Sequence, residues 1–589
     1  MSTIKFLTYA QNVEQNRQAL IQHCRDEGKT VSDDASLSSV VAINNTITGQ
    51  GASSGDEWVF KRRVFNYDGT LLEETPVEVG DAITPPSTTP TIDDPLLEFD
   101  SWVCDTDETT VTHSYSYGAF VRPKETIEVD GEIVRPTIIK MLLTSSIGLS
   151  PTIRWGKTNT VKLYIDWGDG TVDAITSTNT SGTQSHTYAT AGEKIIKMYA
   201  SGGDLSLNKG YYLNTTSSAY SFGTISYNRG VTDFFAGDYF TFNQSSGYDF
   251  YFCENMEHLT GLTITTAIKE YCFAYCYKIK ALILKTIIAT GWSANQLSTS
   301  SSPVFSFTTG LETLIISGDK PLSIYRFGNG LSATPKLKNF NIPNKTRQLG
   351  SGGSNNVDIM GTMIEEIYLP DTVTTTNVSG SSGFGQNFYV KYMRLSPFMP
   401  TFMSIPTYAP IKAIEIPNSQ SNIRFAFSAY NPQLEQIIVP ENVTVWHYIA
   451  QSSLGLKKIV VNGIYNTTSS GVASGCYNLE EIYINQLPTN ISPYIAGDCY
   501  NLKTLTIPVN WDLPINIVQN RKLSDSSLIG IAQNLKDNTG LTAKTLTVST
   551  ALQIRMENIF VDANGVLDEN GTQTLTEYIT GKNWTITAS

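Results

Sequence analysis

Side chains suited to metal binding or catalysis are few and scattered in this chain of 589 residues. Cys272 and Cys276 form a C-x3-C pair without a second pair or a nearby histidine, so we interpret them as small core residues rather than zinc ligands. Asp166 and Asp169 could hold a cation, but such aspartates more often cap turns. The sequence has no Walker A, nucleophile-elbow or HExxH motif. We therefore expect no catalytic residues, no metal, no cofactor and no enzymatic activity.

Polar and aromatic residues suited to binding are grouped between positions 341 and 415, where they recur at equivalent places of a repeating pattern. Tyrosine and arginine are favoured at binding hot spots, and here they stand beside an amide and a carboxylate. The residues that we predict to bind a ligand are Asn341, Tyr368, Lys391, Arg394, Lys412 and Glu415. The alternative is that these side chains only cover the sheet that carries them.

The pattern that positions these residues is apolar-x-x-apolar-x-apolar, and it occurs eleven times. The units begin at Leu259, Ile279, Leu311, Leu337, Ile364, Val390, Ile411, Leu434, Leu456, Leu479 and Leu502. The later units are 21 to 23 residues apart, the middle ones 26 or 27, and one gap is 32. Such a period predicts a solenoid in which each unit adds one short parallel strand to a shared core. The residue between the last two apolar positions then points out of the sheet, on one face.

The repeat resembles the BspA-type branch of the leucine-rich repeats over residues 259–512. The resemblance rests on the strand pattern, on the C-Y-N-L segments that begin at Cys476 and Cys499, and on a proline just after the strand, as at Pro440 and Pro508. BspA-type proteins are cell-surface adhesins of commensal bacteria, so the resemblance implies a solenoid with an adhesive surface. We expect the two cysteines to be neighbours in a packed column, without a redox role.

The position after the first apolar residue of each unit carries charges of nearly alternating sign. It reads Thr260, Lys280, Glu312, Lys338, Glu365, Lys391, Lys412, Glu435, Lys457, Glu480 and Lys503. Neighbouring strands lie about 4.8 Å apart, so the column predicts a ladder of exposed ion pairs worth about 0.2–1 kcal/mol each. Lys391 beside Lys412 breaks the alternation. These two lysines are interpreted as part of a solvated charged column, or else as an unpaired site that attracts an anionic ligand.

Two segments before the repeats resemble β-modules of surface proteins. Val64–Trp102 resembles the Listeria–Bacteroides type of β-repeat, with the segment YDGT as its hairpin signal. Val161–Ala200, with the motifs DWGDGT and SHTY, resembles the polycystic-kidney-disease (PKD) type of β-sandwich. That resemblance implies that Trp167 packs the sandwich core and that Gly168 and Gly170 form a tight turn.

The sequence therefore predicts a multidomain, mainly β protein. The expected order is a helical attachment segment 1–54, a small β-module 55–104, a β-region with a PKD-like sandwich 105–202, an aromatic-rich N-terminal cap of the solenoid 203–258, the leucine-rich-repeat solenoid 259–512 and an α/β C-terminal cap 513–589. For the aromatic-rich stretch 235–256, a hydrophobic cap is favoured over a sugar-stacking site. In the last segment, Ser524 caps a helix that buries Leu528, Ile531 and Leu535 and stops at Gly540.

Composition limits the partners of the chain. Charged residues are 16% of the sequence, the net charge is −13, and the longest basic cluster is 61–63, which argues against nucleic-acid binding. No window approaches 18 consecutive apolar residues, so we expect no membrane span. The first residues show no signal-peptide pattern, so we expect synthesis and retention in a host cytoplasm until lysis.

From these features together we expect a non-enzymatic structural protein on the surface of a bacteriophage virion, most directly a tail fibre that binds the host receptor. Its expected partners are other virion proteins through the N-terminal region, and a host glycan or protein through the repeats. Homo-oligomerisation is left open. The alternatives are a head fibre or decoration protein, a bacterial cell-surface BspA-like adhesin, and a polysaccharide-degrading tail spike.

Overall fold

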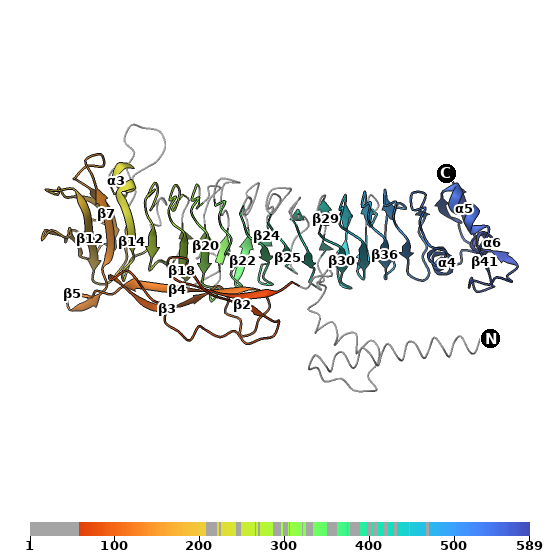
Figure 1. The fold of residues 1–589 in the computed structure, drawn as a ribbon, viewed down its shortest axis with the longest axis horizontal. Helices are drawn as coiled ribbons and strands as arrows, with labels where there is room; N and C mark the ends of the chain where they lie inside the picture. The colour runs from red at the N-terminus through yellow and green to blue at the C-terminus, as the bar shows by residue number, and fades with distance from the viewer. Residues whose placement is uncertain are drawn as a thin grey trace.

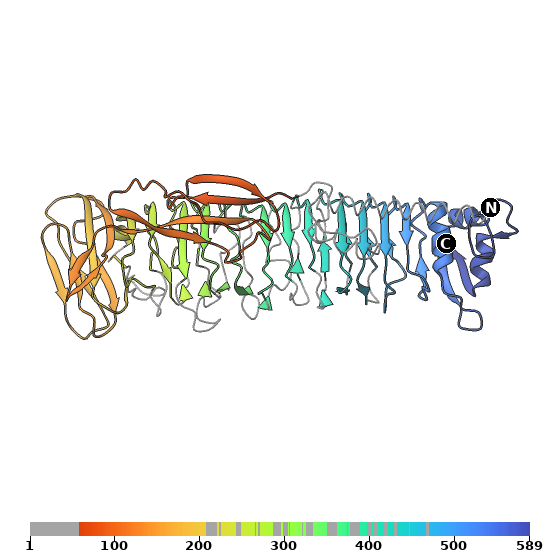
Figure 2. The ribbon, with the colours of Figure 1, turned by 90° about the horizontal axis from the view of Figure 1, so that it is seen from below.

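The computed structural model is an elongated rod, in which a stack of short strands runs from a β-sandwich at one end to a small α/β unit at the other (Figure 1). A four-stranded sheet lies along one side of the stack rather than in line with it (Figure 2). The predicted helical segment 1–54 lies outside the described residues. The structure describes residues 58–207, 221–222, 225–242, 249–265, 267–268, 271–286, 296–297, 304–305, 307–320, 322–324, 334–349, 362–373, 375–376, 389–396, 403–404, 410–417, 422–423, 425–428, 433–446, 448–466 and 471–589.

The strands of the repeat array form three columns of parallel pairs. The first column holds β16 (Thr263–Ile264), β18 (Ala281–Thr286), β20 (Thr313–Ile316), β23 (Glu366–Tyr368), β25 (Tyr392–Arg394), β27 (Ala413–Glu415), β30 (Gln436–Val439), β33 (Lys458–Val461), β36 (Glu481–Ile484) and β38 (Thr504–Thr506). The second holds β17 (Ala267–Ile268), β19 (Gln296–Leu297), β21 (Leu322–Ile324), β22 (Thr346–Leu349), β24 (Thr375–Thr376), β28 (Asn422–Ile423), β31 (Thr444–Val445) and β34 (Ile464–Tyr465). The third holds β26 (Met403–Ser404), β29 (Phe425–Ser428), β32 (Ala450–Gln451), β35 (Ala473–Ser474) and β37 (Ala496–Gly497).

The predicted repeat pattern is confirmed by the burial of its side chains. The first apolar residue of each of the eleven units has at most 2% of its surface exposed. Equivalent residues pair in register from rung to rung, as Ile459 does with Ile482 and Ile482 with Leu505. One hydrophobic core therefore runs through the whole stack. Cys476 and Cys499 are fully buried in it, as the sequence predicted.

A β-sandwich, formed by residues 137–207 and extended by two later strands, covers the first rung of the array. Its larger sheet has the order β10-β9-β12-β7-β14-β15 and contains β7 (Thr137–Leu143), β9 (Leu163–Asp166), β10 (Val172–Ile175), β12 (Gly192–Ala200), β14 (Val231–Phe235) and β15 (His258–Thr260). Its smaller sheet contains β8 (Thr152–Lys157), β11 (Ser181–Ser185) and β13 (Leu205–Leu207). β14 pairs with β7 and also with β15, which carries Leu259 of the first unit. Trp167 is fully buried between the sheets, and Gly168 and Gly170 have φ of 76° and 93°, which a tight turn requires.

The described residues of the aromatic-rich stretch, 235–242 and 249–256, pack into the junction between sandwich and repeats. The stretch follows the short helix α3 (Ile225–Gly230) and β14. Phe240, Phe242 and Phe250 are buried, and Phe250 lies parallel to Phe273 of the next rung at a centroid distance of 5.9 Å. These rings are core side chains of the first rungs, so their faces are not available to a sugar.

The sheet that lies along the array is formed by β1 (Phe60–Phe65), β2 (Leu71–Val77), β3 (Leu97–Cys104) and β4 (Tyr115–Pro123), in the order β2-β1-β4-β3. We call it the covering sheet. β4 pairs with both β1 and β3, so the sheet runs past the expected module boundary at 104 to Pro123. A hairpin of β5 (Ile127–Val129) and β6 (Glu132–Val134) joins it to the sandwich.

The C-terminal unit follows the last rung. It contains β39 (Ile515–Asn516), α4 (Asp525–Asn534), β40 (Lys544–Val548), α5 (Thr550–Met556), β41 (Phe560–Val561), β42 (Gln573–Thr574), α6 (Leu575–Gly581) and β43 (Trp584–Ala588). The predicted helix is confirmed as α4 at its start: the Ser524 side chain accepts a hydrogen bond from Ser527 N, and Leu528 and Ile531 are buried. The predicted stop at Gly540 is wrong, because α4 ends at Asn534 and Leu535, with an extended backbone, is its C-cap. α6, which a capping box at Thr574 begins, was not predicted. Among the described residues, no helix has the length and apolar character that crossing a bilayer requires.

Candidate functional site: the face of the repeat sheet

The outward face of the first strand column, here called the repeat face, is covered over one half and open over the other. All residues of β20, β23 and β25 are buried, although alternate side chains of a strand point to opposite sides of a sheet. In β30, β33 and β36 every second residue is partly exposed. This difference in exposure is caused by the covering sheet, which lies over the first rungs (Figure 2). Its contacts reach as far as Ala413 of β27.

Aromatic rings join the covering sheet to the middle of the repeat face. Tyr392 of β25 stacks on Trp58 with ring centroids 5.6 Å apart, and Phe60 meets it edge-on at 5.3 Å. His113 stacks on Tyr368 of β23 at 3.9 Å. Such pairs contribute about 0.5–1.5 kcal/mol each beyond the burial of their area. Tyr368, which the sequence predicted to bind a ligand, therefore contacts a histidine of its own chain.

Apolar side chains fill the interface over the earlier rungs. Phe65 and Phe120 of the covering sheet pack in one cluster with Ile283 and Ile315 of the repeat face. Gly118 of β4 lies against the same residues, and a Cβ atom there would come within 2.8 Å of the Ile283 side chain. The absence of a side chain at this position is therefore what lets the two sheets approach.

A carboxylate is buried where the covering sheet meets β23. Glu366 accepts hydrogen bonds from Ser114 N at 3.1 Å, from Ser114 Oγ, and from Trp58 Nε1 at 3.2 Å. Burial raises the pKa of Glu366 above its usual value, and the Ser114 bonds only partly offset this effect. Because an unpaired carboxylate is costly to bury, these donors fix the position of the covering sheet on the array.

Asn341 contacts a second buried carboxylate. Its Nδ2 donates to Asp105 Oδ2 at 2.8 Å, and Asp105 also accepts from Ser116 N at 3.0 Å. Burial raises the pKa of Asp105 to about 7. Asn344, three residues further on, donates to Asp107 Oδ1 at 2.6 Å. Asn341, which the sequence predicted to bind a ligand, thus donates a hydrogen bond to Asp105, just after β3 of the covering sheet.

Arg394 is held on three sides by the array itself. Its Nε donates to Glu415 Oε1 at 2.9 Å, one terminal nitrogen pairs with Asp371 at 2.7 Å, and the guanidinium lies 4.7 Å from the Tyr368 ring centroid. Burial, together with the positive charge of Arg394, lowers the pKa of His113 to about 3, so this imidazole is neutral at pH 7. Arg394 therefore orders the tyrosine and the carboxylate that underlie the covering sheet.

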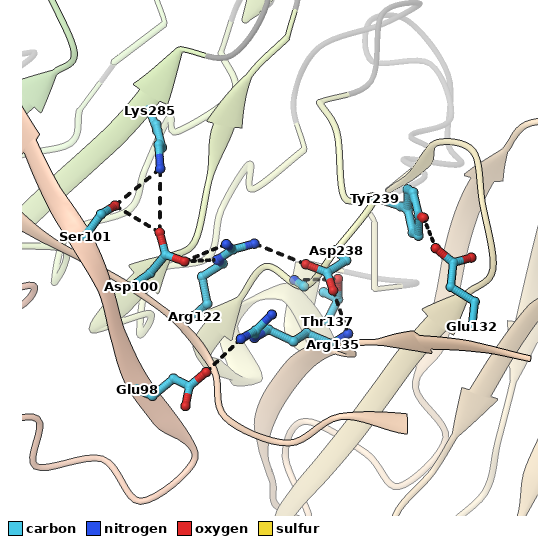
Figure 3. Close-up of polar contacts among 11 residues, drawn as sticks. Glu98, Asp100, Ser101, Arg122, Glu132, Arg135, Thr137, Asp238, Tyr239 and Lys285 are labelled. Carbon is cyan, nitrogen blue, oxygen red and sulfur yellow. Dashed lines mark hydrogen bonds and ion pairs between the residues drawn. The ribbon is translucent and has the colours of Figure 1, made fainter. Parts of the chain in front are cut away.

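Ion pairs anchor the covering sheet near the sandwich (Figure 3). Asp100 of β3 accepts from Arg122 Nε of β4 at 2.9 Å and lies 3.6 Å from Lys285 Nζ of β18. Arg122 also reaches Asp238, after β14, at 3.1 Å. Lys285 donates to Ser101 Oγ at 3.2 Å. Covering sheet, sandwich and array are therefore joined by one polar network as well as by the aromatic contacts.

The open half of the repeat face carries a smaller cluster of the same chemical kind. Lys458 Nζ lies 3.3 Å from Glu481 Oε2 and 5.1 Å from the Tyr483 ring centroid, and Tyr483 Oη donates to Glu481 at 3.2 Å. Ile438 and Val460 stand beside it on the same side of the sheet and are partly exposed. This surface offers an aromatic ring, two apolar side chains and a charge pair to a partner.

The two predicted lysines stand apart from the repeat face, on the charged column. The ladder itself is confirmed: Glu312–Lys338, Glu365–Lys391, Glu435–Lys457 and Glu480–Lys503 lie 2.9, 2.5, 2.7 and 2.9 Å apart. Lys391 is therefore paired with Glu365, and the prediction that it is an unpaired lysine is wrong. Lys412 N donates to Lys391 O at 2.7 Å, which places the two residues on adjacent rungs as expected.

Sequence reasoning placed Asn341, Tyr368, Arg394 and Glu415 on one face, and the structure brings them together there. It did not find the partners of Asn341 and Tyr368, which are Asp105 and His113 between β3 and β4, because they lie more than two hundred residues away in sequence: Asn341 and Asp105 are 236 positions apart. The available signal was the first residue of each strand. It is small at two covered strands, as Ala281 and Ala413 show, and long and polar at the open strands that begin with Gln436 and Lys458. The signal is partial, because the covered strands β23 and β25 begin with Glu366 and Tyr392.

Comparison with known proteins agrees with the repeat pattern. The family described as "BspA type Leucine rich repeat region" matches residues 243–379 and 406–523, in six copies. A solved leucine-rich repeat protein from Bacteroides ovatus aligns with 64% of this chain and 97% of its own at 11% identity, but with a TM-score of 0.25 it is too distant to inform the fold. The search of curated proteins finds no match. Residues 243–379 and 406–523 are therefore BspA-type leucine-rich repeats.

Proposed function

We propose that this chain is a non-enzymatic adhesin of the bacterial cell-surface, BspA-like kind, which binds a partner protein along the open half of the repeat face. The observation that carries the proposal is that the repeat face binds a protein sheet over β18 to β27 and stays open over β30 to β38. The BspA-type repeats support the assignment of the chain to this kind of protein.

The covered half shows which contacts this surface makes with a protein. There, aromatic rings, aliphatic side chains and charge-assisted hydrogen bonds combine in one interface. The open half repeats that combination with Tyr483, Val460 and the pair of Lys458 and Glu481. Aromatic residues ringed by polar groups are the usual anchors of protein interfaces. The open cluster is therefore the part of the array best suited to hold a partner.

The virion fibre expected from the sequence would use the same surface in a different location. The family match supports a cell-surface adhesin through its BspA-type repeats and adds no support to a virion role, so the adhesin is preferred. Attachment through residues 1–54 and self-association remain predictions. Mass spectrometry of purified phage particles, beside immunogold labelling of intact producer cells, distinguishes the two locations.

The test of the proposed function measures adhesion of beads that carry the full-length protein. The beads are offered immobilised extracellular-matrix preparations and bacterial cell envelopes, each with and without prior protease treatment. We expect protease-sensitive binding to the matrix, reduced at least about tenfold by Tyr483→Ala combined with Lys458→Ala. Lys503→Ala is the matched control, because it removes an exposed charge of the same array that lies on the ladder and not on the repeat face. Equal binding by both variants would overturn the use of the open half, and binding to envelopes alone would favour the virion fibre.

A further inference from the structure

A groove lies beside the open half of the repeat face, at the bend where each rung enters its first-column strand. Its volume is about 340 Å³, within the range of roughly 300–1,000 Å³ typical of small-ligand sites. We call it the edge groove. It is lined by Glu435, Leu454, Gly455, Lys457, Asn478, Glu480 and Asn501, which come from consecutive rungs of the array.

The groove exists because one rung lacks a side chain that the next two rungs carry. Gly455, Asn478 and Asn501 occupy the same position, directly before the first apolar residue of their units. Asn478 Nδ2 donates to Leu454 O at 2.7 Å, and Asn501 Nδ2 donates to Tyr477 O at 2.7 Å. Each bond fixes an amide. Asn478 keeps its oxygen and second N–H for another partner, whereas the Asn501 oxygen already accepts from Lys522 Nζ at 2.5 Å and Asn501 keeps its second N–H. Glycine at 455 ends this asparagine column and leaves the hollow.

The charges along the groove cancel in pairs. Lys457 Nζ lies 2.7 Å from Glu435 Oε1, and Lys503 Nζ lies 2.9 Å from Glu480 Oε1. A ligand therefore meets fixed amides, carboxylates and ammonium groups without a net field that would favour an ion. A hydroxyl group both donates and accepts hydrogen bonds, so a ligand rich in neutral hydroxyls can use all of these partners at once.

Two exposed tyrosines are the sequence neighbours of two asparagines that line the groove. Tyr477 and Tyr500 directly precede Asn478 and Asn501, and each has 49% of its surface exposed. Their rings are nearly parallel, at 7°, with centroids 6.0 Å apart, and Tyr500 Oη donates to Asp498 Oδ1 at 2.8 Å. An aromatic face packs well on the apolar C–H face of a pyranose ring, whose edge carries the hydroxyls. The edge groove and the two rings thus offer both kinds of contact on adjacent residues of the same rungs.

We propose that the edge groove, with Tyr477 and Tyr500, is a binding site for a neutral oligosaccharide that lies along the axis of the array. Its sugar rings pack against the tyrosines, and its hydroxyls bond to Asn478, Asn501 and Glu480. The site does not depend on protein adhesion through the open half of the repeat face, which uses a different set of side chains.

The experiment titrates the full-length protein with maltohexaose, cellohexaose and a β-1,4-linked mannohexaose, followed by calorimetry and saturation-transfer NMR. A heparin-derived hexasaccharide serves as the anionic comparison. Gly455→Asn completes the asparagine column and fills the groove, and Tyr477→Ala removes one ring. Tyr494→Ala is the matched control, because this tyrosine is 54% exposed on the same array and, unlike Tyr477 and Tyr500, is not next to an asparagine of the groove. Circular dichroism checks that each variant is folded.

We expect at least one neutral hexasaccharide to bind, with saturation transfer to its ring protons. Gly455→Asn should weaken this binding at least tenfold and Tyr477→Ala at least fivefold, whereas Tyr494→Ala leaves it unchanged. The proposal is overturned if no neutral hexasaccharide binds at millimolar concentration, if the heparin fragment binds in preference to all of them, or if folded Gly455→Asn binds as the wild type does. The bead assay above is read separately, so failure here leaves protein adhesion untouched.

Discussion

Replacing Tyr392 with alanine should loosen the covering sheet and leave the array intact. The Tyr392 side chain is 3% exposed, stacks on Trp58, meets Phe60 edge-on and donates to Glu415 Oε2 at 2.6 Å. Deleting a buried aromatic ring costs about 3–5 kcal/mol. Its neighbour Met393 points into the array core and keeps its contacts, so the loss falls on the interface with the covering sheet.

If the covering sheet loses that much stability, its backbone amides should exchange with solvent roughly 100- to 4,000-fold faster, since about 1.4 kcal/mol is a factor of ten in the opening equilibrium. The assay is hydrogen exchange with mass spectrometry, read on β1 and on the array strands β33 and β36. Tyr483→Ala is the matched control: this tyrosine lies on the same face beyond the cover, where an exposed ring over Lys458 contributes only about 0.5–1 kcal/mol. If β1 exchanges at the same rate in Tyr392→Ala and in the wild type, the covering sheet does not depend on this contact and the reasoning fails.

Three further variants test the core, the close approach and the buried charges. Leu456→Ala removes a fully buried side chain and should cost about 2–5 kcal/mol of unfolding free energy, seen as a lower thermal midpoint; an unchanged midpoint argues against the continuous core. Gly118→Val should push β4 away from Ile283 and speed hydrogen exchange in β4 but not in β36. Unaltered exchange in β4 would contradict the close packing of Gly118 on Ile283. Asp105 has a pKa of about 7, raised from 3.8, so its contribution to stability is present at acid pH and is lost as pH rises through 7. His113, lowered to about 3, contributes above pH 6.5 and loses that contribution as pH falls. Asp105→Asn keeps the size of the side chain and one acceptor oxygen but removes the titrating carboxyl group. Acidification from pH 7.5 to about 5.5 should therefore loosen β4 more in this variant than in the wild type, in exchange rates corrected for intrinsic pH dependence. A smaller acid effect in the variant would refute the assignment of opposing titrations.

The repeat array was predictable because its signal is local and repeated. Leu456, Leu479 and Leu502 recur at intervals of 23 residues, and each such position must be buried against its neighbours. The ion-pair ladder follows from the same register, and Glu480–Lys503 is one example. Stacking turns a pattern in the sequence directly into contacts in space.

The docking of the covering sheet was not predictable in the same way, because no periodic pattern connects its residues to their partners on the repeat face. Trp58 and Glu366 are 308 positions apart, and their bond depends on how a separate sheet docks. From sequence, outward-pointing polar residues such as Asn341 and Arg394 indicate a recognition surface equally well whether the partner is a ligand or the chain itself. Only two covered strands, β18 and β27, begin with a small residue, Ala281 or Ala413, that indicates the close approach of another sheet.

The central claim, that one half of the repeat face is covered and the other open, is tested most directly by the reactivity of single cysteines on that face. Ile315→Cys and Val460→Cys are made in a background in which Cys24 and Cys104 are serine, since the remaining cysteines are fully buried. Ile315 is 1% exposed beneath the covering sheet, whereas Val460 lies beyond it. The account predicts that a maleimide labels the folded Val460→Cys protein at least roughly 100-fold faster than Ile315→Cys. Equal labelling rates at the two positions would contradict it.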